Sequence, residues 1–226
     1  MHSWEIIAAR RDSLLISLIV PPGGPSIDWA LSFRHLQAPP IHDILRWSGY
    51  PWGESRTQAG YELLNRGNQY LFFLDMDVIC PPDTITRLMA HRLPIVSGLY
   101  RQRFPTWTGM ESEYLPCMFN EVRDAQGNPA RANITDFQYG QLVQADFVPG
   151  GCLLVHRIVF EKMLEAGIKR FFEWTLTADN PQGRSEDFEW CARARSIGFR
   201  CFCDSSIQCT HEAPAKVDMK GLSVKL

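Results

Sequence analysis

The chain has 226 residues, of which 45% are hydrophobic and 21% charged, a composition typical of a folded α/β domain and not of disordered or fibrous proteins. Its 23 basic and 25 acidic side chains give a formal net charge of −2, which disfavours broad electrostatic binding to nucleic acid. The longest apolar runs, 14–20 and 70–74, are far shorter than the ~20 residues that cross a bilayer, so we expect no integral membrane span.

The N-terminal region and the cysteines together predict a cytoplasmic protein. Arg10-Arg11 precede the apolar run Leu14–Val20, but this run is short and continues into Pro21-Pro22 without the small-residue cleavage site of a signal peptide. The chain has seven cysteines, an odd number, mostly among apolar neighbours, which favours buried free thiols in a reducing compartment. One group lacks the CxxC spacing typical of a zinc site, so structural zinc is disfavoured there: Cys201, Cys203, Cys209 and His211.

The first predicted elements are a buried strand, a helix and a second strand. Leu14–Val20 is a continuous apolar run bounded by Pro-Pro-Gly-Gly, as expected of a strand buried on both faces. Ser26 then begins a helical pattern with three apolar residues on one side, Ile27, Leu31 and Leu36. Ile41–Trp47 predicts a second short strand.

The alternation continues through residue 100. Ser55 is predicted to cap a helix that Gly67 ends, and Tyr70–Leu74 is a third buried strand. Another helix is predicted to begin at Asp83 or Thr84, and Ile95–Tyr100 is the fourth strand. The apolar residues of that helix are expected to point inward: Ile85, Leu88 and Met89.

Residues 101–144 interrupt the alternation. We expect an insertion of a hairpin and loops there, with a polar turn over 124–128, which shapes the acceptor side. A further strand at Cys152–Val155 and a helix from Arg157 to Ala166 follow. Ser185 is predicted to cap a last helix that Gly198 closes, two strands complete the sheet, and the tail over 212–226 is expected to be a mobile arm. The two strands are Phe199–Cys203 and Ile207–Thr210.

The predicted fold class is therefore α/β. Alternating strands and helices favour a mainly parallel, Rossmann-like sheet with helices on both faces, interrupted by the small hairpin insertion. Without a linker or an internal repeat, we expect residues 1–226 to form a single domain.

Paired carboxylates follow the third buried strand. Asp75 and Asp77 come directly after Leu71–Leu74, at the edge where open α/β sheets bind ligands. If the chain turns there, both can face one hard cation, and their oxygens suit Mg²⁺ or Mn²⁺ with phosphate oxygens completing the shell. The alternative is that one aspartate caps the turn and the other is solvated.

A third carboxylate opens the last helix. Asp187 lies in its first turn, where backbone N–H groups and the helix dipole favour the ionised form, so it can accept a proton from an attacking hydroxyl. The alternative is a capping box, with Ser185 as N-cap and the acids serving only the dipole. His211 ends the last apolar run and is a candidate third metal ligand, or a structural histidine.

These segments, in this order, resemble the GT-A nucleotide-sugar glycosyltransferases, most nearly the family 2-like group in a compact, divergent branch like those of bacteria or phages. The resemblance covers roughly residues 14–212 without the insertion. It rests on four segments: Asp75-Met76-Asp77 after an apolar strand, Gly150-Gly151 before Cys152–Val155, Ser185-Glu186-Asp187, and His211-Glu212.

The resemblance implies roles for individual residues. Asp75-Met76-Asp77 matches the D-x-D motif of the family, which implies Asp77 on the metal, Asp75 near the ribose or metal, and Met76 beside the donor. Asp187 matches the acid that serves as base in inverting members, with Glu186 beside it as a second candidate, and His211 matches a metal-ligand histidine. Four further positions are implied to contact the donor: Pro21, Arg56, Gly150 and Gly151.

The expected function is transfer of a sugar from a nucleotide-sugar donor to an acceptor hydroxyl, with Mn²⁺ or Mg²⁺ as cofactor and inversion favoured. The acceptor is open: a glycan, a lipid, a protein or a modified nucleobase. Two alternatives remain, a nucleotidyltransferase on a related fold and a non-catalytic sugar-binding module of this fold. For the module, stacking platforms are available at Trp107, Trp174 and Trp190.

Overall fold

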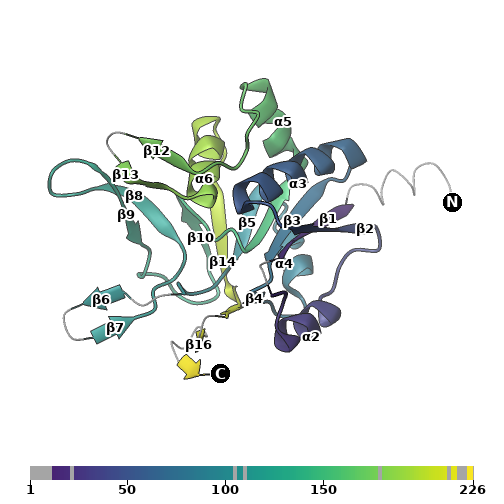
Figure 1. Cartoon of the computed structure of the whole chain (residues 1–226), viewed down its shortest axis with the longest axis horizontal. Coiled ribbons are helices and arrows are strands. Elements are labelled where there is room, and N and C mark those ends of the chain that lie inside the picture. The colour runs from purple at the N-terminus through teal and green to yellow at the C-terminus, as the bar shows by residue number, and fades with distance from the viewer. Residues whose placement is uncertain are drawn as a thin grey trace.

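The computed structural model describes residues 12–20, 23–103, 106–108, 111–177, 180–212, 215–217 and 223–225. A seven-stranded sheet forms the centre of the molecule, in the order β10-β14-β5-β11-β3-β1-β2 (Figure 1). Five strands run in one direction, while β11 lies antiparallel between β3 and β5, and β10 lies antiparallel at one edge. The strands are β1 Leu14–Val20, β2 His42–Ser48, β3 Tyr70–Asp75, β5 Ile95–Leu99, β10 Leu142–Ala145, β11 Cys152–His156 and β14 Cys201–Gln208.

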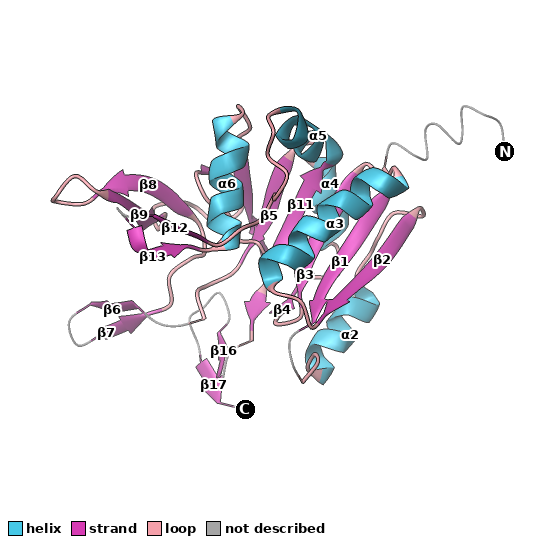
Figure 2. Ribbon diagram, turned by 45° about the horizontal axis from the view of Figure 1, so that its top comes forward, coloured by secondary structure: helices cyan, strands magenta, loops and turns pink. Residues whose placement is uncertain are grey.

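Helices cover both faces of this sheet (Figure 2). One apolar cluster unites α3, α5 and α6 with alternate residues of the strands, such as Leu15 and Phe73. The other unites α2 and α4 with the intervening residues, such as Ile16 and Phe72. Because β1 and β3 are buried on both faces, they read as continuous apolar runs. The predicted α/β class is confirmed; the helices are α2 Ile27–His35, α3 Trp52–Arg66, α4 Thr84–Ala90, α5 Arg157–Glu165 and α6 Glu186–Ser196.

Two helices differ from the prediction in detail. In α2 two of the three apolar residues on one side of the predicted helix do not face the core: Ile27 and Leu31 are 78% and 49% exposed, and Trp29 is buried instead. The Trp29 indole N–H donates to the carbonyl oxygen of Asp75 at 2.9 Å, and this contact sets the helix rotation. Helix α3 begins at Trp52 after Pro51, so Ser55 lies buried inside the helix and is not its cap.

Other helix ends follow the prediction. Gly67 ends α3 with a φ of 77°, a left-handed conformation that glycine adopts without strain, and its N–H reaches the Leu63 carbonyl. Helix α4 starts after Asp83 and buries the three predicted apolar side chains, Ile85, Leu88 and Met89. Among the helices of the described chain, none is long and apolar enough to cross a membrane.

The insertion contains hairpins, as expected. The predicted polar turn joins β8 (Phe119–Arg123) to β9 (Pro129–Asn133), and a smaller hairpin pairs β6 (Thr106–Thr108) with β7 (Glu111–Glu113). The insertion also supplies β10, which joins the central sheet. A hairpin that the sequence did not predict, β12 (Thr175–Thr177) with β13 (Asn180–Arg184), lies near β8 and β9 (Figure 1).

The C-terminal region departs from the prediction of two separate strands. Strand β14 runs through residue 208, with a register shift between Asp204 and Gln208. The chain then enters a small sheet of order β17-β16-β15-β4, formed by Ser223–Lys225, Ala215–Val217, Thr210–His211 and Val78–Ile79. This sheet holds the residues after Asp77 beside His211. The mobility of 212–226 stays a prediction.

Candidate functional site

A cavity of about 590 Å³ gathers most of the predicted site residues. It lies where β3 ends, β11 begins and the chain leaves β14 for β15. Parallel strands β3, β5 and β14 end at this edge of the sheet, which is where open α/β folds bind ligands. The predicted residues that line it are Arg56, Asp75, Asp77, Gly150, Gly151, Glu186, Asp187 and His211.

Arg56 connects several of these residues from beneath the cavity. It is only 2% exposed, and one guanidinium nitrogen donates to both carboxylate oxygens of Asp75 at 2.8 Å. The other terminal nitrogen donates to the Gly150 carbonyl at 2.9 Å, and Nε lies 3.6 Å from Glu186. Burial alone would lower the pKa of Arg56, but the surrounding carboxylates raise it above its ordinary value. Arg56 is therefore a permanent cation that orients Asp75; its predicted contact with the donor stays a prediction.

Asp77 and His211 form a second pair beside the small sheet, where β4 and β15 are paired. His211 Nε2 lies 3.7 Å from Asp77 Oδ2, and Nδ1 is 2.9 Å from the Arg101 carbonyl. Because that carbonyl can only accept, Nδ1 carries a proton, and Nε2 is the ring nitrogen that faces Asp77. Burial raises the pKa of Asp77, but hydrogen bonding and charge from His211, with the charge of Arg103, outweigh burial and lower it below its ordinary value.

Arg103 is a functional candidate that the sequence interpretation missed. Its guanidinium lies 2.5 Å from the same Asp77 oxygen and 3.3 Å from the Glu212 carbonyl, with 35% of the side chain exposed. A signal was available, since Arg103 follows the predicted strand 95–100 at the same sheet edge as Asp75 and Asp77. The position can hold a phosphate as well as a carboxylate, because arginine recognises both.

The three predicted metal ligands do not form one compact group. Within the described residues, the only set of three or more cysteine, histidine or acidic side chains whose ligand atoms all lie within 4.8 Å is Cys80, Cys152 and Cys209. Arg56 donates to both carboxylate oxygens of Asp75, and the place of Asp75 near the ribose or metal stays a prediction. Asp77 and His211 remain as the pair that can share a cation.

The cysteines are free, as predicted, and the disfavoured knuckle is not formed. Cys209 instead contacts Cys80, with the two sulfurs 3.5 Å apart, and Cys80 lies 3.6 Å from Cys152. All three are 5% exposed or less and pack with the apolar cluster beneath α2 and α4. The three cysteines are thus part of the buried core that supports the segments carrying Asp77, Gly151 and His211.

The Gly150-Gly151 segment forms the floor of the cavity with its backbone. The Gly151 N–H donates to the Tyr100 hydroxyl at 2.9 Å, and its carbonyl accepts from the Asp75 N–H at 3.0 Å. A Cβ on Gly151 would lie 2.8 Å from that hydroxyl and 2.9 Å from Asp75 Oδ2. A side chain is therefore excluded at this point by the site itself.

We expect Gly151→Ala to destabilise the protein by about 1–3 kcal/mol, the usual cost of overpacking, and to displace the Asp75 carboxylate. Neither neighbour can retreat easily, since Arg56 holds Asp75 and Tyr100 is buried. Gly150→Ala is the matched control, because its added Cβ would meet only Asp187 Cβ at 3.2 Å and Arg56 at 3.6 Å. Urea unfolding measures both; equal stability of Gly151→Ala and the parent would contradict the packing argument.

Glu186 and Asp187 are the first two residues of α6, and they line the opposite wall of the cavity. Asp187 Oδ1 accepts from the Phe188 N–H at 2.8 Å and from the Ser185 hydroxyl. Ser185 makes no side-chain hydrogen bond to the helix N–H groups, so the alternative of a capping box is not formed. Glu186 is 8% exposed, and burial raises its pKa despite the opposing charge of Arg56.

One predicted donor-binding residue within the described chain, Met76, is not part of the cavity lining. Met76 is 8% exposed and its side chain packs in the core beneath α2 and α4, so only its backbone can approach the donor. Pro21 lies outside the described residues.

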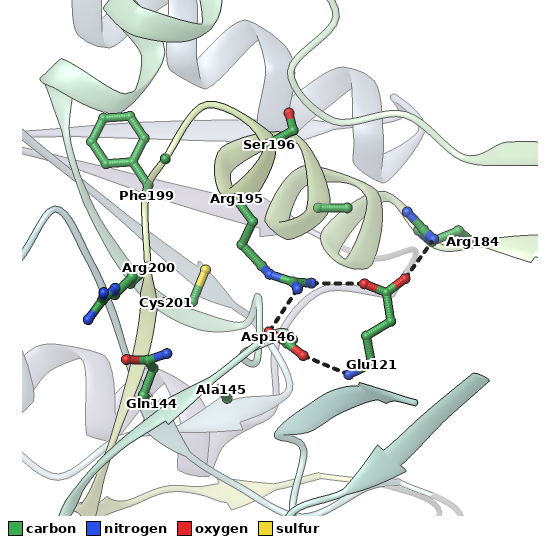
Figure 3. Close-up of a pocket in the computed structure, with 12 residues that line it drawn as sticks. Glu121, Gln144, Ala145, Asp146, Arg184, Arg195, Ser196, Phe199, Arg200 and Cys201 are labelled. Carbon is green, nitrogen blue, oxygen red and sulfur yellow. Dashed lines mark hydrogen bonds and ion pairs between the residues drawn. The ribbon is translucent and has the colours of Figure 1, made fainter. Parts of the chain in front are cut away.

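A separate hollow of about 500 Å³ lies between α6, β8 and β10 (Figure 3). Four of its charged side chains pair with one another: Arg195 lies 3.2 Å from Glu121 and 2.9 Å from Asp146, and Arg184 is 4.0 Å from Glu121. Figure 3 shows these side chains directed at each other across the hollow. These ion pairs connect the insertion to α6. Because Glu121 and Asp146 are neutralised by arginines, we do not consider this hollow a candidate catalytic site.

Comparison with known proteins adds evidence on the fold only. No protein-family model matches the sequence, and no curated protein matches it significantly. Two similar solved structures are an apo UDP-glucose pyrophosphorylase, with a TM-score of 0.37 and 9% identity over 90% of this chain and 78% of that one, and GalNAc-T7 with UDP, GalNAc and Mn²⁺. The latter gives a TM-score of 0.48 and 11% identity over 88% of this chain and 43% of that one.

The protein A197 from STIV resembles this chain over nearly its whole length. The TM-score is 0.57 with 14% identity, covering 94% of this chain and 93% of that one. At this identity the likeness concerns the arrangement of strands and helices. The chain thus shares its mixed α/β architecture with a protein of nearly the same extent.

Proposed function

We propose that this chain is a metal-dependent glycosyltransferase that moves a sugar from a nucleotide-sugar donor to an acceptor hydroxyl, with inversion at the anomeric carbon. One observation carries the proposal: a single cavity holds the Asp77–His211 pair on one wall and the Asp187 carboxylate on another. The first can neutralise a leaving diphosphate and the second can activate a nucleophile, and transfer with inversion needs both.

The residues fit a divalent cation at Asp77 and His211. A histidine ligand ordinarily donates its other ring N–H to a carbonyl or carboxylate, as His211 does toward Arg101. Asp77 supplies an ionised oxygen, and carboxylate with phosphate oxygens suits Mn²⁺ or Mg²⁺, while an imidazole ligand favours the transition metal Mn²⁺ of the two. Bound there, the ion would supply Lewis-acid neutralisation of the diphosphate.

The other side chains have roles set by their contacts. Arg56 fixes Asp75 and the Gly150 carbonyl, so it orients the floor on which the donor sugar lies. Arg103 neutralises Asp77 and is exposed enough to turn toward the diphosphate. Asp187 takes the proton of the acceptor hydroxyl as that oxygen bonds to the anomeric carbon and the nucleoside diphosphate departs.

The two alternatives make different predictions in the same assay. Purified protein is incubated with Mn²⁺ and a panel of nucleotide sugars, with release of nucleoside diphosphate as the readout. A nucleotidyltransferase would form or cleave the sugar nucleotide with pyrophosphate and release no nucleoside diphosphate. A non-catalytic module would bind without turnover.

We expect Mn²⁺ to increase affinity for a nucleoside diphosphate, such as UDP or GDP, and Asp77→Ala to abolish this increase. Calorimetry with Mn²⁺ and with EDTA measures it, and exposed Asp136→Ala is the matched control. His211→Ala should weaken the metal effect less, because Asp77 remains. Arg103→Gln removes the competing cation and should strengthen Mn²⁺ binding measured without nucleotide. Equal affinity in EDTA and Mn²⁺ would refute the metal site.

A further inference from the structure

A second hollow, of about 710 Å³, lies beside the catalytic cavity. Its walls are the start of α3, the segment 170–174 after α5, and the start of α6. We call it the tryptophan hollow, after Trp52 and Trp174, which line it. We propose that it is the acceptor subsite and that it takes a pyranose unit of a neutral carbohydrate; this rests on the proposed function.

The tryptophan hollow adjoins the cavity at the proposed base. Trp52, Glu186 and Asp187 line both spaces. A molecule seated in the hollow therefore has Asp187 at its boundary with the donor cavity. Asp77 and His211 line the cavity and not the hollow, so an acceptor hydroxyl at this boundary can reach Asp187 while the diphosphate position beside Asp77 and His211 stays free.

The walls are held closely together, so the hollow is preformed. Thr57 in α3 exchanges two hydrogen bonds with the Phe172 backbone, at 3.1 and 3.0 Å. A Cβ on Gly53 would lie 3.2 Å from the Phe172 carbonyl and 3.3 Å from Glu186 Cβ, so α3 meets the other two walls without a side chain between them. Preformed walls reduce the entropy cost of binding.

Two exposed indoles give the hollow its chemistry. Trp52 is 53% and Trp174 59% exposed, whereas Trp29 and Trp190 are 4% and 0% exposed. Trp190 is stacked on Phe172 with ring centroids 5.2 Å apart, so its predicted role as a sugar platform is wrong. The side chain of Trp107 lies outside the described residues. Flat indole faces at the rim of a hollow suit the C–H face of a pyranose ring, which is apolar.

The charge of the hollow selects a neutral acceptor. Four carboxylates line it, those of Glu54, Glu173, Glu186 and Asp187, against the one guanidinium of Arg170. Arg170 already lies 3.7 Å from Glu54 and 3.5 Å from Glu173. Two further guanidiniums pair with this lining, Arg193 at 2.9 Å from Glu173 and Arg56 at 3.6 Å from Glu186, so four carboxylates face three cations and the slight negative excess does not attract the phosphates of nucleic acid or of lipid headgroups. Carboxylates do accept hydrogen bonds from sugar hydroxyls, so uncharged carbohydrate fits best.

The test measures binding of maltotriose, cellotriose and chitotriose by calorimetry, without donor. We expect at least one to bind and Trp174→Ala to weaken it about tenfold, as loss of an aromatic stacking contact does. Trp174→Phe should keep most of the affinity, since a ring remains. Tyr139→Ala is the matched control, because Tyr139 is also 53% exposed but lies outside the hollow, and it should change nothing.

Other outcomes separate this proposal from the proposed function. Carbohydrate binding that depends on Trp174, without turnover of any nucleotide sugar, supports the proposed carbohydrate subsite and contradicts the proposed enzymatic activity. Sugar transfer whose acceptor KM is unaffected by Trp174→Ala supports the enzyme and overturns the hollow. No Trp174-dependent binding across the three sugars, or protection of Trp174 from iodide quenching by a single-stranded oligonucleotide and by no sugar, also overturns it.

Discussion

Replacing Asp187 by asparagine is expected to lower the rate of sugar transfer by ~10²–10⁴-fold, the usual loss of a general base, while the protein stays folded. Asp187 lies in the first turn of α6 and faces both the cavity and the tryptophan hollow. The asparagine carbonyl can still accept from the Phe188 N–H, so the helix start keeps its shape. Single-turnover rates and melting temperature, measured on the same preparation, test the claim.

The neighbouring residues provide the controls. Ser185→Ala should leave stability nearly unchanged, because Ser185 makes no capping bond to the helix, and should lower turnover far less than Asp187→Asn, because it removes only a hydroxyl that donates to Asp187. Glu186→Gln should affect stability more than chemistry, because Glu186 is buried beside Arg56. Donor and metal binding should survive in Asp187→Asn, since Asp77 and His211 are on other elements. A folded Asp187→Asn protein with near-normal turnover would remove this residue from the mechanism.

Replacing Arg56 by leucine is expected to lower the free energy of unfolding by about 3–5 kcal/mol, the usual cost of breaking a buried ion pair by removing one partner. The change leaves Asp75, Glu186 and the Gly150 carbonyl without their shared cation. Arg66→Leu is the control on the same helix. Its pair with Glu62 is exposed, and its loss should cost about 0.3–0.5 kcal/mol.

The deficit of Arg56→Leu should grow with pH. Burial raises the pKa of Glu186 in the folded protein, so stability from protonated Glu186 is present at low pH and is lost as pH rises through that raised pKa. Without Arg56 the carboxylate resists ionisation further, and the window of loss moves to higher pH. Urea unfolding at pH 5 and pH 8 should therefore show the larger difference from the parent at pH 8. A deficit independent of pH would contradict this account.

The central strands could be predicted because their local pattern and their burial agree. Leu14–Val20 and Tyr70–Leu74 are apolar at every position except Ser17, and both strands lie between two helical layers. The face of α2 could not be predicted in the same way. A long-range hydrogen bond from Trp29 to the Asp75 carbonyl overrides the local apolar pattern, and no spacing within the helix indicates it.

In the candidate site, too, some features follow from local sequence and others depend on tertiary packing. The position of Asp75 and Asp77 at a strand end, and of Asp187 at a helix start, follows from local sequence, and the structure places all three in one cavity. Their partners do not follow from it. Arg56 reaches Asp75 from α3, and Arg103 reaches Asp77 from the insertion, so both pairings depend on how distant elements pack.

The antiparallel placement of β11 beside β5 has a consequence for how this protein can vary. The chain leaves β5 and returns as the adjacent antiparallel strand β11, so the residues between them form one enlarged connection, which includes β10 at the edge of the sheet. Its inner part is anchored, because Met118 and Phe147 are buried in the core. Its outer part, the β6–β7 hairpin, projects from the body (Figure 2). That outer hairpin can be lengthened, shortened or exchanged without changing the register of any central strand, so this part of the surface can vary while the sheet that positions the cavity residues stays the same.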